Sequence, residues 1–554
     1  MTDLLKKSLS LLSRRQTNIL SAAYIIMATV IFSQLLGLVR NRLLVSIFGA
    51  SNTLGIYNYS LVLPDTIFQL VVASALVSAF IPVFVEYLRD KREKEANEMA
   101  SNLLLIGLIA FSILSIILAI LAPFILKMFN LGANFSASQM DLMANLMRLT
   151  LIGQLLFIIA SFFTAILQSH NRFFIPGFAA ALYNLGTIVG IFVLSSSFGI
   201  FSAPLGGIIG GLLFIVFQIP LAWKLGFRFL PKVSDLFDTG VRKIITLMWP
   251  RTVQNGIQQV GTVALGIIIA FIADPGRMFL LFDYAKILMF APVSLIGFSI
   301  AQAAFPVLSR ENTDMQDFKS TFLNSAYQML YLILPVSALL LVLRIPIVRL
   351  IYGADLFDWD ATVLTGHTLA FFSLSIFAQA LIGLFYRAFY ALHNTIIPLI
   401  TSIVGTASLI VLAVFFVIGE HQGIESIALS FTIANILQLL VLFLILDKMT
   451  GKFNRKDVLL SLGKLFMATL IMAFALYVPI KLLDQLVFDT TRTINLLILT
   501  SISSAAGISL YFFCTWLLNI KEAHTYLMLI RKVGNWREVL YKNEEVIEPT
   551  RTNP

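Results

Sequence analysis

Two arginines interrupt an apolar stretch near the start of the chain. The segment SQLLGLVRNRLLVSIFGA, residues 33–50, has the leucines, valines and glycines of a membrane-spanning helix, yet it contains Arg40 and Arg42. A guanidinium group in hydrocarbon costs several kcal/mol, so an ionisable residue inside a span usually marks a pathway or a binding site. The guanidinium also carries a fixed fork of donors that matches phosphate oxygens. Residue type and position together mark a candidate pathway or binding site inside a membrane.

Extension to the membrane surface is the alternative role for both arginines. Residues 19–39 alone are long enough to cross a bilayer, so either side chain can reach the outer headgroups. We favour this role for Arg42, which lies nearer the outside. For Arg40 we favour an interior position, because the apolar run LLVSIFGA continues beyond it and arginines are biased towards the inner side.

Further polar side chains occur inside later apolar runs. Asp65 lies in the second run and Gln69 is one helical turn further on. Asp283 and Lys286 are spaced i, i+3, which places them on one face of a helix. We predict that Asp65, Asp283 and Lys286 line one inner cavity together with Arg40. A self-satisfied structural pair remains the alternative for Asp283 and Lys286.

The elements that position these residues are membrane-spanning helices. The chain has 554 residues, of which 58% are hydrophobic and only 12% are charged, about half the charged fraction usual in soluble proteins. Apolar runs of about 20 residues recur throughout, without the alternation of β-strands. We therefore predict an all-α polytopic membrane protein. Its fourteen spans fall near 18–48, 54–87, 98–129, 139–168, 173–198, 202–225, 241–273, 277–308, 319–352, 360–392, 395–419, 424–447, 457–482 and 491–519.

The distribution of basic residues predicts the orientation of these spans. Lysines and arginines cluster after the second, sixth and twelfth spans and in the tail, whereas the turns at 49–53, 196–201 and 420–423 contain none. This alternation places both termini in the cytoplasm. It also accounts for the net charge of +10, because the lysines and arginines cluster in the connections predicted to be cytoplasmic. We therefore expect no nucleic-acid partner. No cleavable signal-peptide pattern is present.

An internal repeat divides the chain into two similar halves. ILQSHNRFFIPGF (166–178) resembles FYALHNTIIPLI (389–400), and AFIPVFVEY (79–87) resembles AAFPVLSRE (303–311). Six spans separate equivalent points, so the halves have the same orientation, and such repeats place a transport site between two lobes. We predict a first lobe of spans 1–6 in residues 1–225, a cytoplasmic linker of 226–240, a second lobe of spans 7–12 in 241–447, two extra C-terminal helices in 448–519 and a cytoplasmic tail of 520–554.

The chain lacks the sequence motifs of soluble catalysis. We find no phosphate-cradling P-loop, no HExxH, no CxxC and no GxSxG in a strand–turn–helix context. The pattern is that of a secondary transporter and we expect no enzymatic activity, no cofactor and no metal site. No carboxylate lies deep within spans 7, 11 or 12, so the sequence does not indicate where a coupling ion would bind.

Several segments resemble the MurJ/MviN lipid II flippases of the MOP transporter superfamily. They are LLGLVRNRLLVSIFGA, VLPDTIFQLVVASALVSAFIPVF, LQSHNRFFIPGFAAALYNLGTI, MWPRTVQNGIQQV, APVSLIGFSIAQAAFPVLSRE and YRAFYALHNTIIP. The resemblance implies two six-helix lobes that work by alternating access, with the two extra helices forming a groove for the polyprenyl tail. It also implies a cargo of undecaprenyl-pyrophosphate-linked peptidoglycan precursor, moved from the inner to the outer leaflet, and a place for Arg40 among the family's cavity arginines.

The chain departs from the family's pattern at most of the cavity charges. Gln34 stands where the family has an earlier arginine, and Gln69 stands within its later arginine pair. Other departures are Asn41, Gly55, Phe68, Ala73, Lys286 and Ile287. Asp65, Asp283 and Lys286 are candidates to compensate. The predicted cavity set is Arg40, Lys286, Asp283, Asp65, Gln34 and Gln69.

The sequence therefore predicts a lipid II flippase of the bacterial cytoplasmic membrane. Its partners would be the lipid-linked precursor, membrane lipids and, in some settings, cell-wall synthesis proteins, and its driving force the membrane potential or a gradient of Na⁺ or H⁺. One alternative is a MOP-type exporter of another polyprenyl-linked saccharide or a small molecule. The other is a non-transporting scaffold that recruits cell-wall enzymes.

Overall fold

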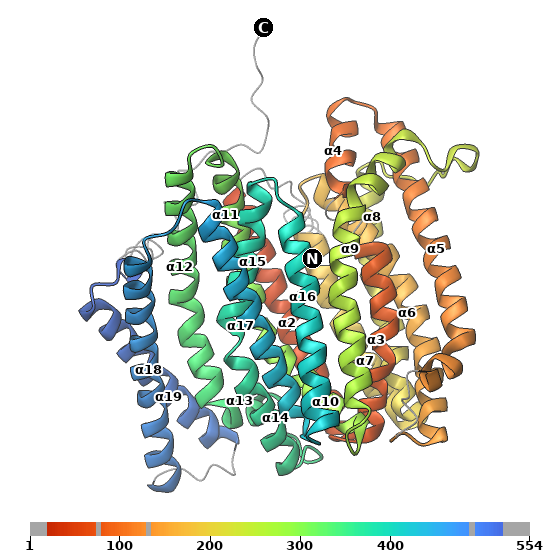
Figure 1. Ribbon diagram of the computed structural model, residues 1–554. Helices are drawn as coiled ribbons and strands as arrows, with labels where there is room; N and C mark the ends of the chain where they lie inside the picture. Colours follow the sequence, from red (N-terminus) through yellow and green to blue (C-terminus); the bar gives the residue numbers. More distant parts are fainter. Residues whose placement is uncertain (1–18, 74–78, 129–133, 487–492, 524–554) are drawn as a thin grey trace, which may run out of the picture. The chain divides into compact units, whose positions relative to one another are not determined.

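The fold is a bundle of long helices (Figure 1). The computed structural model describes residues 19–73, 79–128, 134–486 and 493–523, and within these ranges it contains no strand. The described residues fall into two compact units, one ending at Gln259 and the other beginning at Val260, so the division lies inside helix α9. The predicted all-α architecture is confirmed.

The first unit contains the helices of the first half of the chain and the start of α9. They are α2 (Ile19–Phe48), α3 (Asn52–Phe68), the π-helical turn η1 (Gln69–Ala73), α4 (Ile81–Arg89), α5 (Glu93–Met128), α6 (Ala137–Ser169), α7 (Phe174–Phe198), α8 (Ser202–Lys224) and α9 (Thr239–Ile269).

The second unit contains the remaining helices. They are α10 (Pro275–Pro292), the π-helical turn η6 (Val293–Gly297), α11 (Phe298–Arg310), α12 (Met315–Val342), α13 (Arg344–Tyr352), α14 (Trp359–Ser373), α15 (Ile376–Ala391), α16 (Ile396–Val414), the π-helical turn η7 (Phe415–Gly419), α17 (Ile424–Met449), α18 (Arg455–Leu486) and α19 (Thr493–Leu517).

The protein is a multi-pass membrane protein. Among the described residues, ten helical stretches are long and apolar enough to cross a bilayer, and α14 with α15, bent by 42° at their junction, makes an eleventh. Every one of the fourteen predicted spans overlaps one or two of the α-helices given above, and residues 18, 74–78, 129 and 491–492 of these spans lie outside the described residues. Large apolar side chains remain exposed along these helices, among them Ile120 and Phe192, as expected where a helix faces lipid.

The helix boundaries repeat at the spacing found in the sequence. α6 spans residues 137–169, and α14 with α15 spans 359–391, which is 222 residues later at both ends. The π-helical turn η1 begins at residue 69, and η6 begins at residue 293, which is 224 residues later. A π-helical turn is rare and interrupts the regular α-helical ladder. Its recurrence shows that the two halves share backbone details as well as sequence motifs.

Glycines allow α7 and α8 to pack with their backbones in contact. A Cβ atom added to Gly190 would lie 2.5 Å from the Cα of Gly206, and one added to Gly186 would lie 2.8 Å from the Cα of Gly210. Both helices therefore carry a pair of glycines spaced four residues apart, the arrangement that brings membrane helices close together. Asn184 lies on α7 beside these contacts, so the glycines help to fix its position.

We expect that enlarging Gly190 will destabilise the first unit. A Gly190→Leu side chain meets backbone atoms of α8 that cannot move aside, and such overpacking costs about 1–3 kcal/mol. Thermal unfolding of the detergent-solubilised protein measures the loss. Gly107→Leu is the matched control, because a Cβ added to Gly107 on α5 meets nothing within 4 Å. Equal unfolding temperatures for the two variants would contradict the packing argument.

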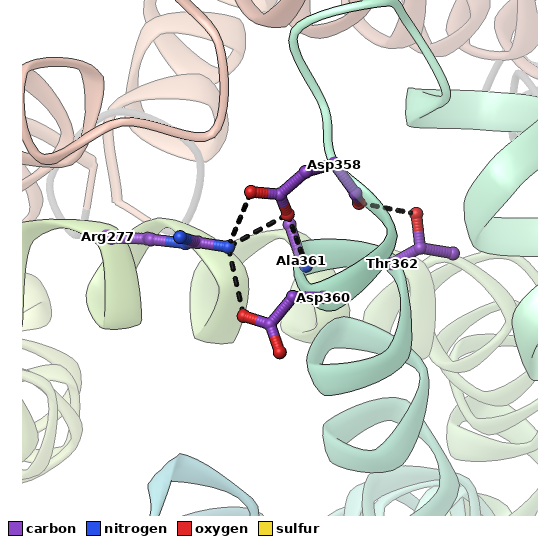
Figure 2. Close-up of polar contacts among 5 residues, drawn as sticks. All are labelled: Arg277, Asp358, Asp360, Ala361 and Thr362. Atoms are coloured by element: carbon purple, nitrogen blue, oxygen red, sulfur yellow. Dashed lines mark hydrogen bonds and ion pairs between the residues drawn. The ribbon is translucent and has the colours of Figure 1, made fainter.

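An ion-pair cluster ties the start of α10 to the start of α14 within the second unit (Figure 2). The Nη2 atom of Arg277 donates to both carboxylate oxygens of Asp358, at 2.8 and 2.9 Å, and to Asp360 at 3.0 Å. Asp358 also caps α14, accepting a hydrogen bond of 2.7 Å from the backbone N–H of Ala361. The acidic segment DLFDWD, residues 355–360, thus helps to position two membrane helices.

Two substitutions of Asp358 should separate its two roles. Asp358→Ala removes the helix cap and the ion pair, and we expect a loss of about 1 kcal/mol or more. Asp358→Asn keeps the cap and weakens only a partly exposed ion pair, so its loss should be smaller. Thermal unfolding of both variants tests this order; equal losses in the two variants would assign the stability to the ion pair instead.

Candidate functional site

Arg40 is held by neutral amide groups in the first unit. Its Nη1 atom donates to Oδ1 of Asn184 at 3.2 Å, and its Nε and Nη2 atoms donate to Oδ1 of Asn41 at 3.4 and 3.3 Å. The side-chain amide of Asn184 in turn donates to the carbonyl and the hydroxyl of Ser33, each at 3.1 Å. The guanidinium therefore has a fixed direction set by α2 and α7.

No carboxylate neutralises Arg40 through an ion pair within the described residues. A guanidinium has five N–H donors, of which these contacts use three, so two are left for a ligand. Arg40 is half-buried, and Asn41 is buried. Neither asparagine offsets the positive charge, so the groups that bond to the guanidinium leave it charged.

Asp65 lies near this arginine but contacts a different helix. Asp65 Oδ1 accepts a hydrogen bond from the side-chain amide of Gln154 on α6. Tyr57 and Tyr183 are each within electrostatic range of both Arg40 and Asp65, which places all four side chains in one cluster. The cluster draws on α2, α3, α6 and α7, so distant parts of the sequence meet at one polar site inside the first unit.

The two predicted glutamines of the first unit lie outside these contacts. Gln34 is exposed on α2, and Gln69 is half-buried in η1. Neither side chain forms a hydrogen bond to Arg40 among the described residues. Their membership of the cavity therefore stays a prediction.

Asp283 and Lys286 both lie half-buried on α10 in the second unit. Within the part of the chain that the structure describes, Lys286 forms no ion pair, and none joins it to Asp283. Asp283 lies within electrostatic range of Tyr352 on α13, a residue that stacks on Tyr284 with ring centroids 4.4 Å apart. The self-satisfied pair considered from the sequence is therefore not formed. That these residues and Arg40 face one cavity stays a prediction.

Sequence reasoning missed two polar residues of the interior. One is Asn184, whose only signal is its amide in the otherwise apolar run of α7. The other is Arg387 on α15, whose guanidinium donates to Gln302 of α11 and to the carbonyl of Gly383, each at 3.0 Å. Arg387 stands in the segment YRAFYALHN, and its position inside a span was a usable signal of the same kind as that of Arg40.

Comparison with known proteins decides the family. Residues 44–502 match the family described as "Lipid II flippase MurJ". The chain belongs to the MurJ family. The predicted resemblance is thus confirmed, and it extends over most of the chain.

Similar proteins of known name agree with the family. A probable lipid II flippase MurJ of Borreliella burgdorferi is 24% identical over 505 residues, covering 91% of this chain and 97% of the relative. A probable lipid II flippase MurJ of Thermotoga maritima is 28% identical over 443 residues, covering 80% of this chain and 88% of the relative.

Solved structures show the same fold. A lipid II flippase MurJ in an inward closed conformation matches with a TM-score of 0.69 at 23% identity, covering 88% of this chain and 99% of that one. An inward-facing multidrug-resistance MATE family transporter of the MOP superfamily matches with a TM-score of 0.64 at 16% identity, covering 77% and 98%. This MurJ chain therefore has the fold shared by MurJ and MATE transporters.

We expect the hydrogen bond between Arg40 and Asn184 to appear as an energetic coupling in this MurJ protein. Hydrogen bonds to charged groups contribute about 1.5–3 kcal/mol, so a double-mutant cycle with Arg40→Leu and Asn184→Leu should show a coupling of at least about 1 kcal/mol in thermal or denaturant unfolding. The control pairs Arg40→Leu with Asn435→Leu, since Asn435 is buried in α17 and bonds to Gln379 instead. Additive losses in both cycles would refute the contact.

Proposed function

We propose that this protein is a lipid II flippase that moves undecaprenyl-pyrophosphate-linked peptidoglycan precursor from the inner to the outer leaflet. Membership of the MurJ family and the names of its relatives support this cargo. The observation that carries the proposal is the guanidinium of Arg40, which lies within a membrane helix, is oriented by Asn41 and Asn184, and forms no ion pair among the described residues.

The chemistry of the cargo fits that group. A pyrophosphate–saccharide headgroup cannot cross hydrocarbon without polar partners, since each uncompensated charge there costs several kcal/mol. The two free N–H donors of Arg40 form the kind of fork that binds phosphate oxygens. Lys286 would supply a second, compact positive charge, because its ammonium group has no ion-pair partner within the described residues.

The remaining predicted residues would contact the uncharged part of the headgroup. Asp65 and Asp283 offer acceptors to sugar hydroxyl and peptide N–H groups, and the amides of Gln34 and Gln69 offer both donors and acceptors. A site of this composition holds the phosphates by charge and the saccharide by hydrogen bonds. It differs from a cavity lined mainly by arginines, because binding would depend strongly on a single guanidinium.

Alternating access needs helices that bend, and the π-helical turns η1 and η6 supply such points. η1 and η6 interrupt the second span of each half at equivalent positions, and Pro292 ends α10 directly before η6. Helices kink at π-helical turns and prolines because the ladder of hydrogen bonds is broken there. We propose that these turns are the hinges, and that the membrane potential or a gradient of Na⁺ or H⁺ drives the cycle.

The proposed topology follows from the family and from the charge distribution. The protein would reside in the bacterial cytoplasmic membrane with both termini in the cytoplasm, because the basic connections of the chain lie on that side. Among the described residues, no group of three or more His, Cys, Asp or Glu side chains is placed to hold a metal ion.

Complementation tests the cargo and the role of Arg40. Cells depleted of their own lipid II flippase would express the wild type, Arg40→Ala, Arg40→Lys and the control Arg148→Ala at matched membrane levels. Arg148 is an exposed arginine of α6 that contacts Ala119 and Asn145. We expect the wild type and Arg148→Ala to support growth, Arg40→Ala to fail, and Arg40→Lys to rescue in part, since lysine keeps the charge without the fork.

The other outcomes contradict specific parts of the proposal. A well-expressed wild type that does not rescue would exclude lipid II and point to another polyprenyl-linked saccharide or a small molecule. Rescue by Arg40→Ala as strong as that by the wild type would exclude the arginine as the phosphate-binding group. Transport of lipid II in proteoliposomes, driven in turn by an imposed potential, a Na⁺ gradient and a H⁺ gradient, would identify the driving force.

A further inference from the structure

The linker between α8 and α9 is bound to the side of α5 through its backbone. The N–H of Leu230 donates to the hydroxyl of Ser101 at 2.9 Å, and the N–H of Lys232 donates to Oδ1 of Asn102 at 2.8 Å. The amide of Asn102 donates in return to the carbonyl of Asp235 at 3.0 Å. Ser101 and Asn102 are 0% and 1% exposed, so these bonds are shielded from water. The linker therefore has a defined conformation.

These contacts place the linker at the level where α5 enters the membrane. Asn97, which donates to the carbonyl of Gly226 at 3.1 Å, and Asn102 lie just before the apolar run of residues 103–111. Figure 1 shows the linker beside the first turns of α5. Phe227 anchors it further, packing in the first unit with its ring centroid 5.9 Å from that of Phe163. The proposed topology assigns this level to the cytoplasmic leaflet.

The side of the linker that faces away from α5 is both apolar and basic. Its exposed apolar residues are Trp223, Phe229, Leu230, Val233 and Phe237, of which Val233 is 71% exposed. Its exposed basic residues are Lys224, Arg228, Lys232, Arg242 and Lys243, against two acidic residues, Asp235 and Asp238. Lys243 pairs with Glu86 at 2.7 Å, whereas Lys224 and Lys232 form no ion pair among the described residues.

We propose that residues 223–243 are a binding surface for anionic phospholipids of the inner leaflet. Aromatic and aliphatic side chains on such a surface enter the boundary between headgroups and acyl chains, and neighbouring lysines and arginines attract lipid phosphates. The linker supplies both kinds of side chain along one short exposed segment, RFLPKV, residues 228–233. The buried bonds to α5 hold it at the depth where headgroups lie.

Charge and position together favour a lipid over a soluble protein as the partner. The positive side chains flank the exposed apolar ones, as an anionic headgroup above an acyl chain requires. The linker leads directly into α9, so lipid binding would stabilise the start of that helix. This inference rests on the linker and on the proposed topology, and it does not depend on the identity of the transported cargo.

A fluorescent probe at Val233 tests the proposal in the full-length protein. Cys514 is the only cysteine, so Cys514→Ala with Val233→Cys gives a single labelling site for an environment-sensitive dye. The protein would be reconstituted in phosphatidylcholine with and without phosphatidylglycerol, and quenching by spin-labelled lipid would report insertion. We expect quenching that increases with phosphatidylglycerol and weakens with salt.

Variants of the linker give this measurement its controls. Lys224→Gln with Lys232→Gln should weaken the preference for phosphatidylglycerol by at least about fivefold, because each basic residue near an anionic surface contributes about 1 kcal/mol. Phe229→Ser with Phe237→Ser should abolish quenching in both lipids. Lys127→Gln, at the far end of α5, should leave the preference unchanged. A probe that stays in water, or quenching independent of phosphatidylglycerol, would overturn the proposal.

Discussion

The structure depends on the cost of keeping a positive charge inside a membrane. The role proposed for Arg40 requires hydrogen bonds without neutralisation, because an ion pair would weaken the attraction for an anion while an unsatisfied guanidinium would be expelled towards water. Two asparagines meet this requirement, since amide oxygens accept its hydrogen bonds and carry no net charge. Asn184 can do so only because α7 is held against α2 and α8, and the glycine contacts between α7 and α8 are part of that arrangement.

Most of the fold was predictable from the sequence because the membrane imposes simple rules. Length and apolar composition indicated each span, and the fourteen predicted spans all overlap α-helices. These rules do not predict local features such as π-helical turns, helix caps and ion pairs. No sequence pattern indicated the π-helical turns, because they depend on how a helix packs. The cap and ion pairs of Asp358 were also missed, since an acidic loop is usually only solvated.

The candidate site was predictable only where a charge stood out against an apolar background. Arg40, Asp65 and Lys286 could be named from the sequence for that reason. Asn184 could not, because an uncharged amide in a span is a weak signal and its partner Ser33 is 151 residues away. The pairing of Asp283 with Lys286, considered as an alternative, is absent among the described residues for a related reason. A spacing of i, i+3 places two side chains on one face of a helix, but it does not by itself bring their charged ends into contact.

The paired π-helical turns show that the two halves retained a common backbone after their side chains diverged. The offset of 222 to 224 residues between the halves gives three candidate positions for each equivalent residue. For Arg40 they are Thr262, Val263 and Ala264, and for Asp65 they are Ile287, Leu288 and Met289. Conversely, Val62, Leu63 and Pro64 stand where Lys286 would have its counterpart. The π-helical turns that we propose as hinges are therefore duplicated, whereas each charge is present once. Evolution in such a molecule can change the chemistry of one half while the other keeps the shared machinery of movement intact.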